Sequence, residues 1–211
     1  MEVAVLKSHT FAESTKKSYA SCLRIYYKFC ELHNLTPWPA STENTCRYIA
    51  YLARSKAYTT IQQYLSVLGL LHLELDLPHP VQNIHSVKSL MRAVRREKGT
   101  PVAYKLPLSV EQLKEVRDHL NINVLKDAQL WAIILCCFYG LLRISNVTVP
   151  HPSKWDPLKI LQRKDVSFCS KGCIMRLRWS KTIQYQERML EIPLPYLPGK
   201  VLCPTAALLH F

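Results

Sequence analysis

The stretch that decides the fold is Leu130-Trp-Ala-Ile-Ile-Leu-Cys-Cys-Phe-Tyr-Gly-Leu-Leu142, which runs directly into Arg143-Ile-Ser-Asn-Val147. The run is almost wholly apolar and predicts a helix from Asp127 to about Tyr139, buried on most of its sides. It stops at Arg143, short of the ~18–20 apolar residues that a membrane-spanning helix needs. The sequence therefore predicts a buried helix with an arginine just beyond its end.

Arg143 has two interpretations at this point. A guanidinium beside an apolar core is costly unless it finds an anion or a hydrogen-bonding partner. It is either an ordinary helix-end arginine that pairs with a carbonyl or carboxylate, or a residue that binds an anionic ligand. The arginine alone leaves both interpretations open.

Beyond residue 150 the pattern changes to strands. Lys164 to Phe168 is a short strand candidate, and two further runs alternate apolar with other side chains. These runs place Met175, Leu177 and Trp179 on one face, and Leu190, Ile192 and Leu194 on another. Together they predict a small antiparallel sheet with a hairpin turn near Gln184 to Glu187.

Before the buried helix, residues 10–98 predict four consecutive helices. Thr10, Thr42 and Thr60 are the expected N-caps of the first three, and the fourth is expected from about Val81 to Lys98. A segment rich in glycine and proline follows, and Ser109-Val-Glu-Gln112 is another capping box. We therefore expect a helical domain over 1–98, a linker over 99–108 and a second domain over 109–211.

The fourth helix carries a stripe of basic residues. Lys88, Arg92, Arg95 and Arg96 lie at i, i+4, i+7 and i+8, opposite the apolar face that includes Val87 and Val94. Such a stripe can follow a phosphate backbone, or it can be a solvated surface. Glu97 is the only acidic residue in the helix, which favours phosphate contact.

Charge supports the same interpretation. The chain has 28 Lys and Arg against 15 Asp and Glu, for a net charge of +13. The excess is present on both sides of residue 100, so no single basic tail explains it. A globular chain that is basic throughout is typical of proteins that contact a polyanion.

The remaining composition narrows the class of protein. No membrane segment and no secretory signal is evident. Most of the eight cysteines lie in apolar helical patterns, which indicates free thiols and a reducing, intracellular compartment. Cys169 and Cys173 have a spacing close to that of metal ligands, but no paired histidine accompanies them, so we expect no metal and no cofactor.

In combination, these motifs closely resemble the tyrosine recombinase (phage integrase) family. The resemblance rests on the order of a helical domain, Gly140-Leu-Leu-Arg-Ile-Ser145, the hairpin Trp179-Ser-Lys-Thr182 and Ile192-Pro-Leu-Pro195. It is strongest to the recombinases of eukaryotic mobile elements of the Crypton and DIRS type. The resemblance implies a SAM-like core-binding domain followed by an α+β catalytic domain, mainly α with a small sheet, acting on DNA in the nucleus.

Two catalytic residues carry over by position. Arg143 matches the family's first catalytic arginine, which binds the scissile phosphate, and Lys181 matches the hairpin lysine, which protonates the leaving oxygen. The family often has an acidic residue three places after that arginine. Here the residue is Asn146, so the corresponding ion pair is in doubt.

The family's remaining motifs are missing. No His-x-x-Arg occurs in the sequence, and no tyrosine follows such a motif, the last being Tyr196. Without the nucleophile no phosphotyrosyl intermediate can form, so we expect a catalytic domain that is incomplete and inactive alone.

The first hypothesis is therefore a recombinase-derived protein that binds double-stranded DNA and can assemble on it as a homo-oligomer. Its expected contacts are the basic stripe with Arg47, Arg54, Lys56, Thr59, Thr60 and Gln62. The alternatives are a fragment of a complete, active site-specific recombinase and a helical module that binds protein.

Overall fold

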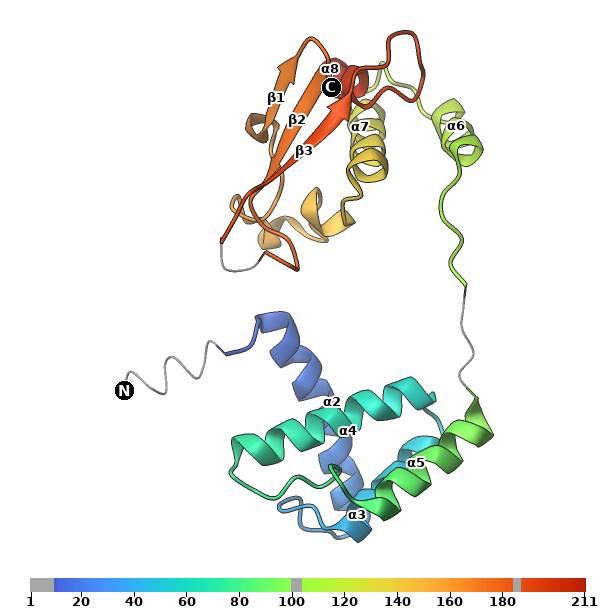
Figure 1. Ribbon diagram of the computed structural model, residues 1–211, viewed down its shortest axis with the longest axis vertical. Helices are drawn as coiled ribbons and strands as arrows, with labels where there is room; N and C mark the ends of the chain where they lie inside the picture. Colours follow the sequence, from blue (N-terminus) through green and yellow to red (C-terminus); the bar gives the residue numbers. More distant parts are fainter. Residues whose placement is uncertain (1–9, 100–103, 184–186) are drawn as a thin grey trace, which may run out of the picture. The chain divides into compact units, whose positions relative to one another are not determined.

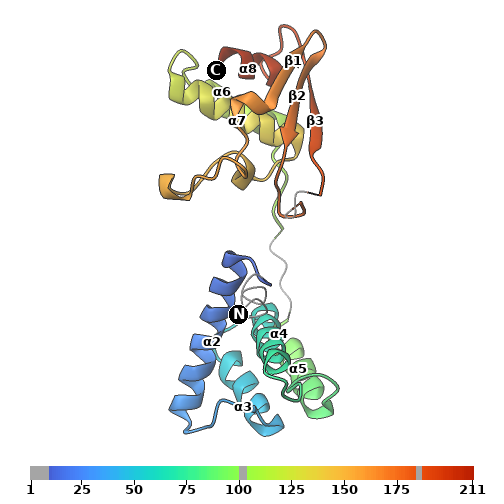
Figure 2. The ribbon, with the colours of Figure 1, turned by 90° about the vertical axis from the view of Figure 1, so that its left-hand side faces the viewer.

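The computed structural model of the protein describes residues 10–99, 104–183 and 187–211. Within these ranges the chain is mainly helical with one small antiparallel sheet (Figures 1 and 2). It divides into two compact units, Met1–Tyr104 and Lys105–Phe211. None of the described helices is long and apolar enough to cross a membrane. The predicted linker lies at the junction of the units, with residues 100–103 outside the described ranges.

The described residues of the first unit form four helices, as the sequence predicts. They are α2 (Glu13–Leu32), α3 (Thr42–Ala53), α4 (Tyr58–Glu74) and α5 (His85–Lys98). Aromatic side chains of α2 and α3 fill the centre, with the rings of Tyr26 and Tyr48 5.1 Å apart and those of Phe29 and Tyr48 also 5.1 Å apart. Aliphatic residues of α4 and α5 complete this core, among them Ile61, Leu65, Leu68, Val87 and Val94.

Several predicted helix starts are wrong. The observed N-caps are Ala12, Ser41 and Ala57 in place of Thr10, Thr42 and Thr60. Only Ser41 of these three caps its helix with a side-chain oxygen, which accepts from the Asn44 N–H. The fourth helix begins at His85 rather than Val81 because His79 caps the preceding turn. Its Nδ1 accepts from the N–H groups of Val81 and Gln82.

The second unit begins with α6 (Val110–Asp118), whose predicted capping box is confirmed: Ser109 Oγ accepts from the Gln112 N–H and Gln112 Oε1 from the Ser109 N–H. The buried helix is α7 (Leu125–Gly140), and α8 (Pro204–His210) packs beside it. Two short 3-10 turns, η1 (Ile144–Asn146) and η2 (Pro152–Lys154), follow α7.

The sheet of the second unit has the order β1-β2-β3, with both pairs antiparallel. Its strands are β1 (Val166–Cys169), β2 (Gly172–Leu177) and β3 (Leu190–Pro195), and the 3-10 turn η3 (Arg163–Asp165) precedes β1. The helices α7 and α8 lie on one face, where Cys136 of α7 packs against Met175 and Leu194 (Figure 1). The sequence placed β1 two residues early and extended β2 to Trp179. Most of the predicted hairpin turn, residues 184–186, lies outside the described residues.

The buried imidazole of His72 generates a pH dependence in the first unit. Its Nδ1 lies 2.8 Å from the Leu68 carbonyl, to which it donates, so Nε2 is unprotonated and accepts from the Ala40 N–H at 2.9 Å. Burial lowers the pKa of His72, and the folded unit therefore holds it neutral. The unfolded chain takes up a proton below its ordinary pKa of ~6.5.

We therefore predict that the free energy of unfolding of the first unit falls as pH drops below ~6.5, by up to ~1.4 kcal/mol per pH unit for this one proton. Hydrogen exchange of residues 13–98 between pH 5 and 8 measures it. The variant His72→Gln loses this dependence, whereas His33→Gln, at an exposed histidine, keeps it. Equal pH profiles for wild type and His72→Gln would contradict the prediction.

A second prediction concerns Gly69, in the interior of α4. Alanine is ordinarily favoured over glycine in a helix by ~1 kcal/mol. Here a Cβ would collide with the imidazole ring of His79, which its two backbone hydrogen bonds hold in place. We expect Gly69→Ala to lower the free energy of unfolding by ~1–3 kcal/mol in denaturant titrations. The double variant Gly69→Ala/His79→Ala removes the collision and should recover part of that loss; no recovery would exclude this cause.

Candidate nucleic-acid interface

The basic stripe of the first unit lies on the open face of α5. Lys88, Arg92, Arg95 and Arg96 are all exposed, while Val87 and Val94 on the opposite face are buried. The guanidinium of Arg95 lies 5.8 Å from the centre of the Tyr58 ring, which holds the first turn of α4 against α5. The structure thus presents four cations in one row with an anchored arginine among them.

The other predicted DNA contacts are less uniform. Arg47 and Arg54 share the exposed face of α3, but Arg47 also forms an ion pair of 2.5 Å with Glu43. Lys56 is half-buried between α3 and α4. The first turn and a half of α4 contains the polar residues Thr59, Thr60 and Gln62, and its Tyr58 contacts Arg95. The Tyr58–Arg95 contact therefore places the start of α4 beside the α5 stripe.

A second basic row was missed in the sequence. Lys17, Arg24 and Lys28 lie at i, i+7 and i+11 of α2, and all three side chains are exposed. The helical spacing itself was the signal, because positions seven and eleven apart share one face of a helix. The first unit thus carries exposed cations on both α2 and α5.

In the second unit, a strained residue terminates α7. Leu141 adopts the left-handed conformation, with φ 50° and ψ 35°, and its side chain is 90% exposed. Left-handed backbone is unfavourable for a leucine by ~1–2 kcal/mol. Elsewhere in the described ranges, the non-glycine residues with positive φ are Asn34, Asp76 and Asn83, types that tolerate it. The strain lies two residues before Arg143.

Arg143 does not behave as an ordinary helix-end arginine. Its side chain is exposed, and no residue in the described ranges accepts a hydrogen bond or ion pair from its guanidinium. The burial cost expected from the sequence is therefore not incurred. A guanidinium presented in this way keeps its planar set of N–H donors available for an oxyanion.

The backbone of Arg143 is held by Asn146, which is only 2% exposed. Asn146 Oδ1 accepts from the Arg143 N–H at 3.1 Å, and Asn146 Nδ2 donates to the Trp179 carbonyl at 3.2 Å. The Asn146 N–H also donates to the Arg143 carbonyl at 2.8 Å. A neutral amide thus takes the place of the acidic residue that the resemblance leads one to expect. It links the arginine to the segment that carries Lys181.

Lys181 lies in a tight turn two residues beyond Trp179. The backbones of Ser180 and Ile183 exchange two hydrogen bonds of 3.2 and 3.1 Å, and both residues are buried. Ser180 Oγ also accepts from the Thr182 N–H at 3.2 Å. Lys181 itself is exposed. Two buried residues thus fix the turn and leave the lysine at its surface.

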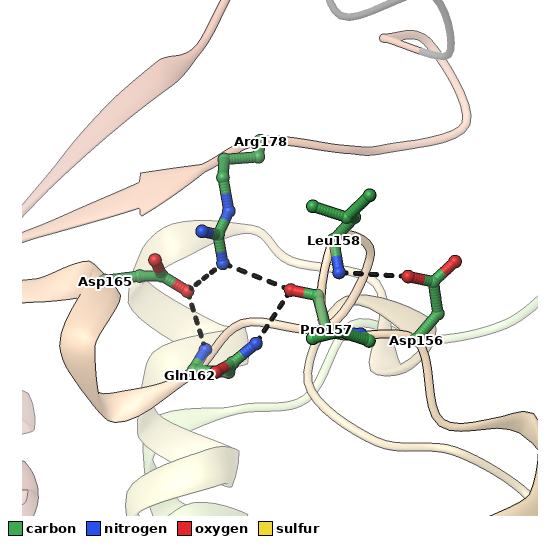
Figure 3. Close-up of polar contacts among 6 residues, drawn as sticks. All are labelled: Asp156, Pro157, Leu158, Gln162, Asp165 and Arg178. Carbon is green, nitrogen blue, oxygen red and sulfur yellow. Dashed lines mark hydrogen bonds and ion pairs between the residues drawn. The ribbon is translucent and has the colours of Figure 1, made fainter.

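A polar network holds the strand extension before this turn (Figure 3). Arg178 forms an ion pair of 2.7 Å with Asp165 and donates to the Pro157 carbonyl at 3.3 Å. Gln162 donates to both from the other side, through its N–H to Asp165 at 2.9 Å and through Nε2 to Pro157 at 2.7 Å. The loop from Asp156 to Asp165 is therefore fastened to the residue that precedes Trp179.

Cys136 and Cys173 of the second unit are buried in its core, whereas Cys169 is exposed. Burial raises the pKa of the Cys136 thiol to about 12, which keeps it protonated and unreactive at neutral pH. Cys169 and Cys173, the pair with near-metal spacing, lie at the turn between β1 and β2. In the described part of the chain no three His, Cys, Asp or Glu side chains gather as a metal site would require.

No family model matches the chain. It is 28% identical over 199 residues to an integrase/recombinase xerD homolog of Selenomonas ruminantium, an alignment that covers 93% of this chain and 55% of that protein. It is also 32% identical over 142 residues to recombinase cre of Escherichia phage P1, covering 65% of this chain and 41% of that protein. The chain thus spans about half the length of the curated relatives it matches. Both similarities support a relationship to the tyrosine recombinases.

Proposed function

We propose that this chain binds double-stranded DNA as the core-binding and partial catalytic region of a tyrosine-recombinase-like protein. In this proposal the first unit is the SAM-like core-binding domain, and the second is part of the α+β catalytic domain. The observation that carries the proposal is the exposed cationic face of α5, formed by Lys88, Arg92, Arg95 and Arg96. The names of the two relatives support it.

Phosphates are the ligands that this face suits. Lysine and arginine side chains that neutralise phosphates release counterions from DNA, so affinity depends steeply on salt. The residues at the start of α4 add neutral donors, of which Thr59 and Gln62 are exposed. Contacts of these kinds position a protein on duplex DNA and carry little sequence information. We expect weak sequence selectivity from the first unit.

In the second unit, we propose that Arg143 holds a backbone phosphate through paired N–H groups. The Asn146–Trp179 hydrogen bond, which joins the Arg143 turn to the segment that carries Lys181, supports a role for both residues in one site. The same groups stabilise charge on a phosphate during phosphoryl transfer. The 211 residues contain neither His-x-x-Arg nor a tyrosine beyond such a motif. We therefore propose that they bind DNA without cleaving it. A covalent protein–DNA adduct on a nicked duplex would instead favour the alternative of an active recombinase.

Three finer points belong to the same proposal. We propose an origin in a eukaryotic mobile element of the Crypton or DIRS type, action in the nucleus, and assembly of more than one copy on DNA. The alternative of a protein-binding helical module requires the α5 stripe to be ordinary solvated surface.

The experiment is a titration of duplex DNA at several salt concentrations. We predict that the logarithm of affinity falls linearly with the logarithm of salt concentration. Changing the four α5 cations to glutamine should make that slope shallower by up to ~4, because each lost phosphate contact contributes ~0.9. The matched control changes the exposed Lys114, Lys126, Lys171 and Lys200 of the second unit to glutamine. It removes the same charge and should alter the slope much less. A flat salt response, or equal effects of the two variants, would refute DNA binding by α5.

A further prediction separates geometry from charge at Arg143. Arg143→Lys keeps the charge but loses the paired N–H groups, so duplex affinity should fall on the order of tenfold with unchanged stability. Asn146→Asp keeps the acceptor for the Arg143 N–H but sets a carboxylate oxygen against the Trp179 carbonyl. We expect it to lower the free energy of unfolding of the second unit by ~1–3 kcal/mol. Binding assays and denaturant titrations measure the two effects; a large stability loss in Arg143→Lys would show that the arginine is structural.

A further inference from the structure

A cleft of about 500 Å³ adjoins the Lys181 turn. One wall is the loop that carries Leu158 and Lys159, and the other is formed by Trp179 with Arg188 and Met189. These five residues belong neither to the basic stripe of α5 nor to the candidate phosphate site at Arg143 and Lys181. Because Trp179 lies two positions before Lys181, anything bound in the cleft lies next to that lysine's turn.

The walls of the cleft are held by the contacts already described. Arg178, at the base of the Trp179 wall, is tied to Asp165 and to the Pro157 carbonyl, and Pro157 directly precedes Leu158 (Figure 3). The Trp179 carbonyl accepts from Asn146. The Leu158 loop and the Trp179 segment are therefore held in place before any ligand binds, which reduces the ordering cost of binding.

The lining combines apolar and cationic groups. Leu158 and Met189 are 59% and 51% exposed, and the indole of Trp179 is half-buried beside them. Lys159 Nζ lies 5.9 Å from the centre of the Trp179 ring, at the limit of a cation–π contact. Arg188 is exposed on the opposite wall. A flat apolar surface flanked by cations is the arrangement that proteins use for unpaired nucleotides, whose bases stack on aromatic rings while basic side chains bind the phosphates.

The acidic residue of the lining does not oppose this ligand. Asp156 accepts from the Leu158 N–H at 3.0 Å and pairs with Lys159 at 3.0 Å. Its carboxylate is thus turned to its own loop, as Figure 3 shows for the Leu158 contact. The lining contains three basic side chains, Lys159, Arg178 and Arg188. Asp156 pairs with Lys159 and Asp165 pairs with Arg178, so the positive charge of Arg188 remains in excess and favours an anionic ligand.

We propose that this cleft binds an unpaired nucleotide of a DNA strand, with the base against Trp179 and the phosphate between Lys159 and Arg188. The proposal rests on the proposed DNA binding and adds to it a preference for DNA that contains an unstacked base. A duplex has its bases stacked inside, so an intact duplex offers nothing to Trp179.

The test compares the affinity of the full chain for an intact duplex and for the same duplex with a single-nucleotide gap or bulge. We expect the wild type to prefer the interrupted duplex roughly tenfold, in the range of one base stacked on an aromatic ring. Trp179→Ala and Arg188→Gln should each reduce that preference, and Trp179→Phe should retain most of it. Lys200→Gln, which removes an exposed charge outside the cleft, should leave it unchanged.

The outcomes separate this proposal from DNA binding itself. Normal salt-dependent binding of intact duplex, with no preference for the interrupted duplex in the wild type, overturns the cleft proposal alone. A preference that survives both Trp179→Ala and Arg188→Gln also overturns it. Failure to bind either duplex overturns the proposed function. Arg188→Gln, at an exposed side chain, keeps the test decisive should Trp179→Ala unfold the unit.

Discussion

Asn146 has a side-chain amide that lies away from water, and an amide in that position requires both a donor and an acceptor. It finds the donor in the Arg143 N–H and the acceptor in the Trp179 carbonyl, 33 residues further along the chain. These bonds join the turn of Arg143 to the segment that carries Lys181, and they add to the packing of α7 against Met175 and Leu194 of the sheet. Because the amide is neutral, this hydrogen-bonded connection does not depend on the titration of a side chain or on the screening of an ion pair by salt.

A residue with strained backbone, Leu141, lies close in sequence to the hydrogen-bonded side chain of Asn146. Leu141 turns the chain out of α7 in a conformation that is unfavourable for its side-chain type, and the hydrogen bonds of Asn146 follow within five residues. On the other side, the ion pair between Arg178 and Asp165 fixes the residue before Trp179. Strained backbone persists where its surroundings over-determine it, and such places are often binding sites. In the second unit, these polar contacts thus lie next to the segments that carry the exposed side chains of Arg143 and Lys181.

Much of the fold was readable from the sequence because it follows from periodicity. The four helices of the first unit, the buried α7 and the three strands all have apolar residues at helical or strand spacing. The cap at Ser109 was also correct, because its glutamine partner lies three residues away. The helix starts predicted at Thr10 and Thr60 were wrong although both threonines begin a capping-box pattern. Thr10 lies before the first helix, and Thr60 lies inside α4. The start of α4 depends instead on packing of Tyr58 against α5, which no local pattern contains.

The exposed cations of the α5 stripe could be predicted from the sequence, but the contacts that hold the segments around Arg143 and Lys181 could not. The stripe on α5 needed only helical spacing, whereas the Asn146–Trp179 and Arg178–Asp165 contacts join residues 33 and 13 positions apart.

The contact between Arg95 and Tyr58 has a consequence for the energetics of recognition. The guanidinium of Arg95 already rests over the Tyr58 ring, so it has fewer rotamers to give up than Arg92, an exposed arginine for which the described residues provide no such ring contact. The side chains of the α5 stripe carry equal charges but would lose different amounts of conformational entropy on contact with a polyanion. Arg95, which the Tyr58 ring already holds, would lose the least.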